Sequence, residues 1–292
     1  MKKHKEDVFS SELYYIPKPS CSYKMENVVL ILRSVLFTFA FYTTTFIQMI
    51  LYAPVYFLMP RKKAWIVPKT WARVTLFLQK YIAGTSYEIE GLENLPRGAY
   101  IIAPKHQSAW ETFSLVPYFE DPTLILKREL MWIPLFGWYM AKTQIIPINR
   151  TTPIKALKTI IQKAKEKAKQ GRQILIFPEG TRRQPGQEPD YKSGIVALYN
   201  ELGLQVVPIA HNAGLYWPRN NFRRYPGKIR VRILPPIEAG LNKRDFLDQL
   251  VQKTEKACDE LLLLAAQDPT PPPMPPTAIQ KLQKFNHHET IE

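Results

Sequence analysis

The spacing of hydrophobic and polar positions changes once along the chain, near residue 84. Before it the apolar positions form long runs, and after it they form short runs separated by turn residues. Short β-branched runs are typical of strands, and apolar positions that recur every three or four residues are typical of helices. The pattern therefore predicts a helical part over residues 26–83 and a separate α/β domain over residues 84–267.

In the second part, short apolar strands alternate with amphipathic helices. The clearest helix is expected over residues 153–170, where Thr151 or Thr152 can cap the start and Gly171 can close the end. Another apolar-faced helix is expected over residues 243–267. The predicted strands are residues 100–103, 123–126, 144–148, 173–177, 205–209 and 229–234. The fold class should be α/β, with a mixed, largely parallel sheet flanked by helices and its functional loops at one sheet edge.

The first part contains a long uncharged stretch. Residues 34–59 carry no formally charged side chain, and a helix of that length, rising ~1.5 Å per residue, could cross a hydrocarbon core of about 30 Å. Lys and Arg are equally numerous on its two flanks, which favours both ends on one side. A second apolar stripe with basic neighbours follows between Trp71 and Tyr81. We interpret residues 26–83 as a membrane-associated helical hairpin; the alternative is a buried core helix with its partner.

The two ends of the chain differ from these parts. Residues 1–25 form a polar segment with the acidic Glu6 and Asp7, which argues against a cleaved signal peptide. Consecutive prolines between residues 269 and 276 lack amide donors and favour an extended backbone. Residues 268–292 are therefore expected to be a proline-rich flexible tail, with a polyproline ligand for a partner domain as the alternative.

Charge narrows the choice of partners without deciding it. The formal net charge of +15 implies attraction to an anionic membrane surface, to phosphorylated substrates or to nucleic acid. There are two cysteines, Cys21 and Cys258, and they lie outside any metal-ligand spacing. We therefore expect a reducing compartment and no metal.

A histidine and a glutamate five positions apart, His106 and Glu111, follow the predicted strand at residues 100–103. On one straight helix this spacing turns the side chains apart by about 140°. His106 is therefore expected on the turn before the helix, and Glu111 in its first turn, where Ser108 and Glu111 can form a capping box. There the carboxylate could orient the imidazole as a general base. The alternative is that Glu111 only caps the helix and His106 is a partly buried histidine without a chemical role.

A second motif, Phe-Pro-Glu-Gly-Thr-Arg, occupies residues 177–182 after another predicted strand. Gly180 frees the backbone for a tight turn, Thr181 offers a hydroxyl, and the guanidinium of Arg182 fits phosphate oxygens. Glu179 can either touch a substrate or brace Arg182. Together the two motifs outline acyl transfer to an alcohol that carries a phosphate.

These motifs resemble those of the glycerolipid acyltransferase family. Residues 106–111 are similar to its H-x4-D/E motif, and residues 177–182 to its phosphate-binding motif. Residues 127–150 and 206–209 resemble its second and fourth motifs, in the expected order. One departure is Glu111, because Asp is the commoner acid at that place. Within the family the similarity is strongest to the bacterial members that acylate lysophosphatidate.

The resemblance implies a reaction and a set of roles. An acyl group would pass from acyl-CoA or acyl carrier protein to the sn-2 hydroxyl of lysophosphatidate, giving phosphatidate, with no cofactor and no covalent acyl-enzyme. It implies that His106 is the base and that Glu111 orients it. The implied contacts to glycerol and phosphate are Lys127, Arg150, Glu179, Gly180, Thr181 and Arg182. The protein would lie at the inner membrane, with its catalytic domain in the cytoplasm.

Other functions remain open on the sequence alone. The acceptor could be another lysophospholipid or a lyso-aminolipid, and the chain could be a lipid-binding protein without catalysis. A nucleic-acid-binding module could use the basic positions of residues 219–232, with Phe222 and Tyr225 among them. These positions are Arg219, Arg223, Arg224, Lys228, Arg230 and Arg232. We favour a membrane-facing surface, and expect no nucleic-acid partner, because the apolar hairpin already places the chain at lipid.

Overall fold

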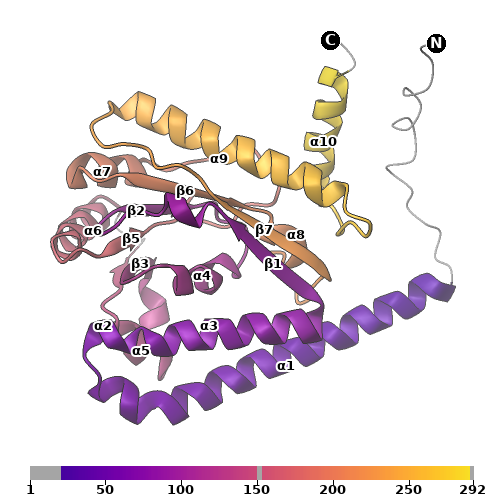
Figure 1. Ribbon diagram of the computed structural model, residues 1–292, viewed down its shortest axis with the longest axis horizontal. Coiled ribbons are helices and arrows are strands. Elements are labelled where there is room, and N and C mark those ends of the chain that lie inside the picture. Colours follow the sequence, from indigo (N-terminus) through magenta and orange to yellow (C-terminus); the bar gives the residue numbers. More distant parts are fainter. Residues whose placement is uncertain (1–20, 150–152, 290–292) are drawn as a thin grey trace.

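A seven-stranded sheet forms the centre of the computed structural model, which describes residues 21–149 and 153–289 (Figure 1). The strands are β1 (Thr85–Glu90), β2 (Ile101–Pro104), β3 (Pro122–Lys127), β4 (Ile146–Ile148), β5 (Gln173–Leu175), β6 (Val206–His211) and β7 (Gly227–Ile233). Their order is β1-β7-β6-β2-β5-β3-β4, and neighbours run parallel except for β6 and β7. The mixed, largely parallel sheet that the alternating pattern predicted is therefore confirmed.

Helices cover both faces of this sheet. Those of the α/β domain are α4 (Glu111–Ser114), α5 (Phe136–Lys142), α6 (Pro153–Ala168), α7 (Ser193–Leu202), α8 (Ala213–Tyr216) and α9 (Lys243–Ala266). Short 3-10 helices span Leu92–Asn94, Val116–Tyr118 and Arg128–Trp132. Successive residues of β2 point to opposite faces, so Ile101 packs in the cluster with α6, α7 and α9, whereas Ile102 packs in the cluster with α4. The apolar run of β2 is explained by burial on both faces.

β1 is the strand that the hydrophobic pattern did not predict. It pairs with β7 over its whole length and forms one edge of the sheet. Glu88 and Glu90 lie opposite Arg230 and Arg232 in the register, at ion-pair distances of 3.1 and 3.2 Å. A charged edge strand lacks the apolar run used to recognise the other strands, because one of its faces meets water.

The N-terminal part forms a helical hairpin against the domain. It consists of α1 (Cys21–Leu58), α2 (Arg61–Ala64), α3 (Ile66–Leu78) and a π-helix over Gln79–Ala83. An aromatic cluster joins the hairpin to the domain, with the rings of Phe37 and Trp217 edge to face at 5.5 Å and those of Trp71 and Phe113 at 5.3 Å. At the tip, both terminal nitrogens of Arg61 reach the Asp121 carboxylate, at 2.6 and 2.8 Å. The hairpin and the domain thus share one core.

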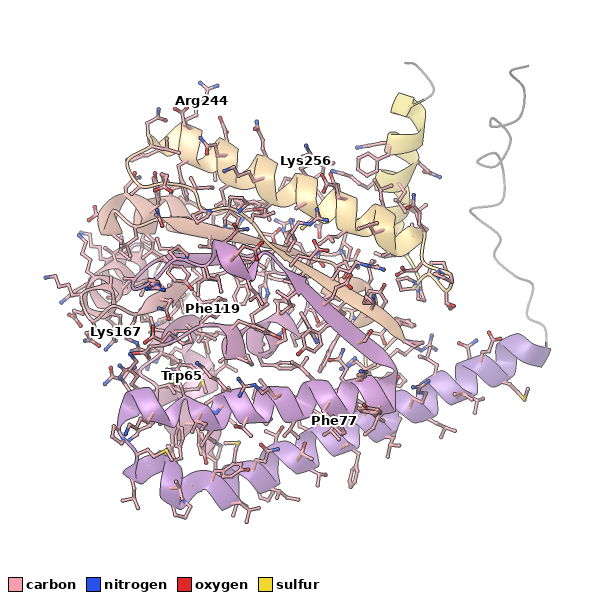
Figure 2. All side chains as sticks on the ribbon, in the orientation of Figure 1. Trp65, Phe77, Phe119, Lys167, Arg244 and Lys256 are labelled. Carbon is pink, nitrogen blue, oxygen red and sulfur yellow. The ribbon has the colours of Figure 1, made fainter. Side chains whose placement is uncertain are left out.

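The outer side of the hairpin exposes apolar side chains. By length and composition, Met25–Leu58 could cross a membrane, and only 11% of an 18-residue apolar stretch within it is buried. Phe39, Leu51 and Phe77 are 68%, 68% and 60% exposed. Figure 2 shows Phe77 on this side, whereas Arg244 and Lys256 project from α9 on the opposite side. The hairpin side of the molecule is therefore apolar, and the α9 side is charged. A soluble monomer rarely exposes so large an apolar surface.

The C-terminal segment corrects the expectation of a flexible tail. Residues Pro276–Glu289 form a helix, α10, whose Ala278 and Leu282 are 0% and 7% exposed in the main core cluster. Pro276 begins the helix, where the N–H that proline lacks would have no intrahelical partner. α9 ends at Ala266, and the proline-rich segment links the two helices. The prolines marked an interruption correctly, but the apolar i, i+4 pair beyond them predicts a helix that packs.

Candidate active site

His106 and Glu111 meet at the carboxyl end of β2. The turn between β2 and α4 brings His106 Nδ1 to 2.8 Å from Glu111 Oε1. The same oxygen accepts the N–H groups of Gln107 and Ser108, at 2.9 and 2.8 Å, which is one half of the expected capping box. The other half differs, because Ser108 Oγ accepts the N–H of Trp110 at 3.1 Å and not that of Glu111. The Glu111 carboxylate therefore fixes both the turn and the imidazole ring.

The charge on Glu111 decides which nitrogen of His106 carries the proton. Burial opposes the charge, but the imidazoles of His211 and His106 and the N–H of Ser108 together hold the pKa of Glu111 below its ordinary value. A carboxylate only accepts hydrogen bonds, so the proton lies on Nδ1 of His106 and Nε2 keeps its lone pair. Within the described residues Nε2 has no hydrogen-bond partner. The ring stacks on Phe177, with centroids 4.0 Å apart, and its side chain is 13% exposed. An imidazole held in this way has the tautomer that a general base needs.

The Phe-Pro-Glu-Gly-Thr-Arg turn lies against His106. β5 is the parallel neighbour of β2, so the turns after both strands lie at one sheet edge, where α/β folds bind their ligands. Gly180 has a φ of 65°, the left-handed conformation for which the sequence reserves a glycine. The His106 N–H donates to Glu179 Oε2 at 3.1 Å, and the Arg183 N–H donates to the His106 carbonyl at 2.7 Å. The two motifs are thus joined by direct hydrogen bonds.

Glu179 lies behind this turn and does not brace Arg182. It is 0% exposed, and its Oε1 forms an ion pair with Lys105 Nζ at 2.9 Å. The same ammonium lies 2.7 Å from Glu255 Oε1 on α9. Burial raises the pKa of Glu179, and Lys105 opposes that shift. Sequence reasoning missed Lys105 and Glu255, although a lysine directly between a buried strand and His106 was a signal that its charge needs a buried partner.

The remaining predicted contacts lie at the rim or beyond the described residues. Thr181 is exposed and Arg182 is half-buried, and no ion pair occupies the Arg182 side chain within residues 21–149 and 153–289. Lys127 ends β3, the next parallel neighbour of β5, where it is exposed and lies 3.9 Å from Glu129. Arg150 lies outside the described residues. Among the described residues, no group of three or more His, Cys, Asp or Glu side chains is placed to hold a metal ion.

The basic positions between residues 219 and 232 divide into two sets. Lys228, Arg230 and Arg232, on β7, form ion pairs with carboxylates of β1, α9 and the segment after α9. Arg219, Arg223 and Arg224, in the loop before β7, have no carboxylate partner in the described part of the chain. Arg224 lies 4.2 Å above the Trp217 ring, and burial lowers the pKa of its guanidinium to about 10. Three of the six basic side chains that nucleic-acid binding would use are therefore already paired with carboxylates.

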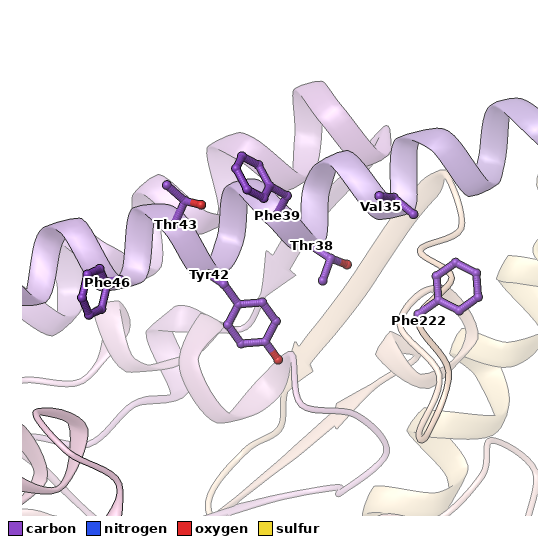
Figure 3. A pocket seen from close by; sticks show the side chains of 7 residues that line it. All are labelled: Val35, Thr38, Phe39, Tyr42, Thr43, Phe46 and Phe222. Carbon is purple, nitrogen blue, oxygen red and sulfur yellow. The ribbon is translucent and has the colours of Figure 1, made fainter.

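An apolar groove of about 580 Å³ runs along α1, and His106 is not among its lining residues (Figure 3). Its lining residues are Val35, Thr38, Phe39, Tyr42, Thr43, Phe46 and Phe222. Phe222 comes from the loop before β7, and the others come from the outer side of α1. The groove belongs to the apolar side of the molecule, so the exposed apolar surface continues from the hairpin onto this loop.

His211 is a second histidine at the site, which sequence reasoning missed. It is 0% exposed at the end of β6, the other parallel neighbour of β2. Its Nδ1 accepts the Ala213 N–H at 3.3 Å, so Nε2 carries the proton and donates to the Lys105 carbonyl at 2.7 Å. Burial lowers the pKa of His211, although Glu111 Oε2, 4.0 Å away, opposes that shift. The neutral His211 ring therefore stabilises the Lys105–His106 turn through its hydrogen bond to the Lys105 carbonyl.

This neutral histidine predicts a loss of stability in acid. Unfolded His211 takes up a proton near its ordinary pKa of 6.5, whereas the folded form resists protonation. The stabilisation is complete above pH 6.5 and is lost as the pH falls through the folded pKa, by at most about 1.4 kcal/mol per pH unit. Thermal unfolding of the full chain between about pH 7.5 and 5.5 should show this slope, and His211→Gln should flatten it. Equal slopes in both proteins would contradict the assignment.

Comparison with known proteins identifies the class. The model of the family described as Acyltransferase matches residues 86–212, which hold both turns. A protein from Pseudomonas aeruginosa is 42% identical over 196 residues, covering 67% of this chain and 76% of that relative. The chain belongs to the acyltransferase family, and it is an enzyme of that class.

The similar proteins carry a more specific name. The relative from P. aeruginosa is a 1-acyl-sn-glycerol-3-phosphate acyltransferase, and so is one from Cocos nucifera that is 30% identical over 171 residues, covering 58% of this chain and 55% of that relative. The fold is similar to that in the crystal structure of the 1-acyl-sn-glycerophosphate (LPA) acyltransferase PlsC from Thermotoga maritima, with a TM-score of 0.65 and 22% identity. That match covers 79% of this chain and 97% of the other.

Proposed function

We propose that this enzyme transfers a fatty acyl group from an acyl thioester to the sn-2 hydroxyl of lysophosphatidate, giving phosphatidate and a free thiol. The observation that carries the proposal is the 2.8 Å contact between His106 Nδ1 and Glu111 Oε1, on a turn hydrogen-bonded to the segment that bears Arg182. The relatives from P. aeruginosa and C. nucifera are 1-acyl-sn-glycerol-3-phosphate acyltransferases, which supports this acceptor.

In the proposed reaction, His106 Nε2 takes the hydroxyl proton while the hydroxyl oxygen attacks the thioester carbonyl carbon. A C–O bond forms and the C–S bond breaks, so the electron pair leaves on sulfur. The imidazolium then returns its proton to that sulfur and is neutral again. Glu111 stabilises the imidazolium and keeps the proton of the resting ring on Nδ1. The carboxylate is thus needed in the resting state and in the charged state.

Transfer is proposed to be direct, without a covalent acyl-enzyme. Cys258 lies buried on α9, and burial raises the pKa of its thiol to about 12. A thiol with that pKa is protonated at neutral pH and is a poor nucleophile. Its place inside the protein favours a packing role over an acyl-accepting one.

We propose that the turn at residues 180–182 holds the phosphate of the acceptor. The left-handed conformation of Gly180 turns the backbone, and the Arg182 guanidinium has no competing carboxylate within the part of the chain that the structure describes. Thr181 adds a hydroxyl, and Lys127 and Arg150 are proposed to add charge from neighbouring turns. Glu179 would act indirectly, because a buried carboxylate that already holds Lys105 and the His106 amide is unsuited to phosphate.

We further propose that the apolar side of the molecule lies on the inner membrane, with the catalytic domain in the cytoplasm. The exposed side chains of α1 and the groove beside Phe222 support this placement, because lysophosphatidate is an amphiphile held in a bilayer. Apolar insertion resists salt, unlike purely electrostatic binding. The full chain should therefore float with anionic vesicles even in about 0.5 M NaCl, and complete release by that salt would contradict insertion.

A panel of acceptors tests the reaction. The full chain in detergent micelles, given a labelled acyl thioester, should acylate lysophosphatidate in preference to lysolipids with larger head groups and to lyso-aminolipids. Arg182→Gln should raise the KM for lysophosphatidate by about 10-fold, the typical effect of losing a charge-assisted hydrogen bond. Arg244→Gln, which removes an exposed charge on α9, is the matched control and should leave the KM for lysophosphatidate unchanged. Acylation only of the larger lysolipids would contradict the proposed acceptor.

A further inference from the structure

A pocket with a mixed polar and apolar lining, beside the His106–Glu111 turn, has no part in the proposed reaction steps. Its volume is about 220 Å³. Gln107, Arg219 and Asn221 line it with amide and guanidinium groups, and Leu215, Met274 and Pro275 line it with apolar ones. One wall comes from the loop after α8, and another comes from the proline-rich segment before α10.

This pocket is attached directly to both motifs. Gln107 follows His106 in the chain, so their Cα atoms are about 3.8 Å apart. The side-chain oxygen of Gln107 accepts the Gly214 N–H at 3.2 Å, which ties the turn to the pocket wall. Arg219 Nη1 donates to the carbonyl of Arg182 at 2.6 Å. A ligand in this pocket would therefore lie next to the backbone of both motifs.

The C-terminal helix holds the proline-rich wall in place. Thr277 Oγ1 donates to the Pro185 carbonyl at 2.7 Å, and Lys281 lies 3.2 Å from Asp259 on α9. Gly186 has a φ of 77°, and a Cβ there would lie 2.6 Å from Ala278 Cα, so the loop and α10 are in close contact. The wall is thus fixed between two helices and the loop that follows the phosphate-binding turn.

The chemistry of the lining selects a ligand class. Arg219 is exposed and has no carboxylate partner in residues 21–149 or 153–289, so its guanidinium can take a phosphate. The rest of the lining combines the side-chain amides of Gln107, Gln184 and Asn221 with apolar surface. In the proposed function, Arg182 already serves the phosphate of the acceptor, which leaves Arg219 for the donor. Both kinds of donor, acyl-CoA and acyl carrier protein, present their thioester on an arm with a phosphate, a dimethyl carbon and two amides.

We propose that this pocket binds the phosphopantetheine arm of the acyl donor, with Arg219 on its phosphate and the proline-rich segment against its apolar part. The inference rests on the proposed function and goes beyond it, because it assigns the donor site. It also gives the C-terminal segment a role, since Met274 and Pro275 complete a wall that the acyltransferase domain itself does not supply.

Steady-state kinetics of the full chain test the assignment. Arg219→Gln should raise the KM for acyl-CoA and for acyl carrier protein by about 10-fold, and should leave the KM for lysophosphatidate within about twofold. Met274→Trp, which fills the pocket from its other wall, should raise both donor KM values as well. Arg223→Gln, four residues along the same loop and outside the pocket lining, is the matched control and should leave all of them unchanged.

An acyl-pantetheine donor without phosphate isolates the contact. The wild type should bind it more weakly than acyl-CoA, and Arg219→Gln should bind it as the wild type does. A raised KM for lysophosphatidate in place of the donor would overturn the inference while leaving the proposed function intact. A rise for acyl-CoA alone would place Arg219 on the nucleotide and would overturn the shared-arm assignment. Absence of transfer by the wild type from any donor would overturn the proposed function itself.

Discussion

Replacing His106 with alanine is expected to lower kcat by about 10²- to 10⁴-fold while the protein remains folded. The substitution removes the lone pair of Nε2, which is the base proposed for the acceptor hydroxyl. The KM values should change little, because backbone groups of residue 106 hold the turn at residues 180–182. Its N–H donates to Glu179, and its carbonyl accepts from Arg183. Initial rates with a labelled acyl thioester in detergent micelles measure this effect.

Two controls separate chemistry from folding in that experiment. Thermal unfolding of His106→Ala should stay close to that of the wild type, since the ring is at the surface of the core, where it stacks on Phe177. His106→Gln retains most of the volume and a hydrogen-bond donor but supplies no base, and it should be as inactive as the alanine variant. Turnover near the wild-type rate in either variant would refute the base assignment.

Replacing Glu111 with glutamine is expected to lower kcat by a similar factor, about 10²- to 10⁴-fold. The amide oxygen can still accept Nδ1–H of His106, but the substitution removes the negative charge that stabilises the imidazolium. The glutamine oxygen can still accept the N–H groups of Gln107 and Ser108, so the turn should survive.

The aspartate variant is the matched control for Glu111. Glu111→Asp keeps the carboxylate one methylene shorter, so it should retain far more activity than Glu111→Gln when initial rates are compared. If Glu111 had only a structural role, the Asp and Gln variants would have similar activity, because both side chains offer acceptor oxygens to the backbone. Equal activity in Glu111→Gln and the wild type would show that the carboxylate only caps the turn.

The sequence predicted the contacts that are local and missed those that join distant segments. His106 and Glu111 are separated by one turn, so their spacing alone was enough to expect the hydrogen bond that is present. Lys105, Glu179 and Glu255 come from three segments, and their ion pairs become visible only when β2, β5 and α9 are placed side by side. For the same reason, a pattern along one segment could not reveal that His211 lies buried beside Glu111.

The differences in the fold have similar physical causes. The apolar runs of the inner strands predicted the sheet because burial on both faces leaves a strong signal in the sequence. β1 meets water on one side and carries Glu88 and Glu90, so its signal was too weak. α10 comes after prolines that interrupt the chain, and the apolar residues by which it packs, Ala278, Leu282 and the partly buried Phe285, are separated by polar ones, so the signal was weak. Prolines mark where a helix ends, but they do not determine the structure of the residues after them.

A double-mutant cycle between His106 and Glu111 tests the central claim most directly. If the two residues act as one unit, removing the carboxylate from an enzyme that already lacks the imidazole should not lower kcat further. The kcat of His106→Ala/Glu111→Gln should then equal that of His106→Ala within about threefold. If the two losses multiply instead, so that the double variant is slower by the product of the single effects, Glu111 does not act through His106.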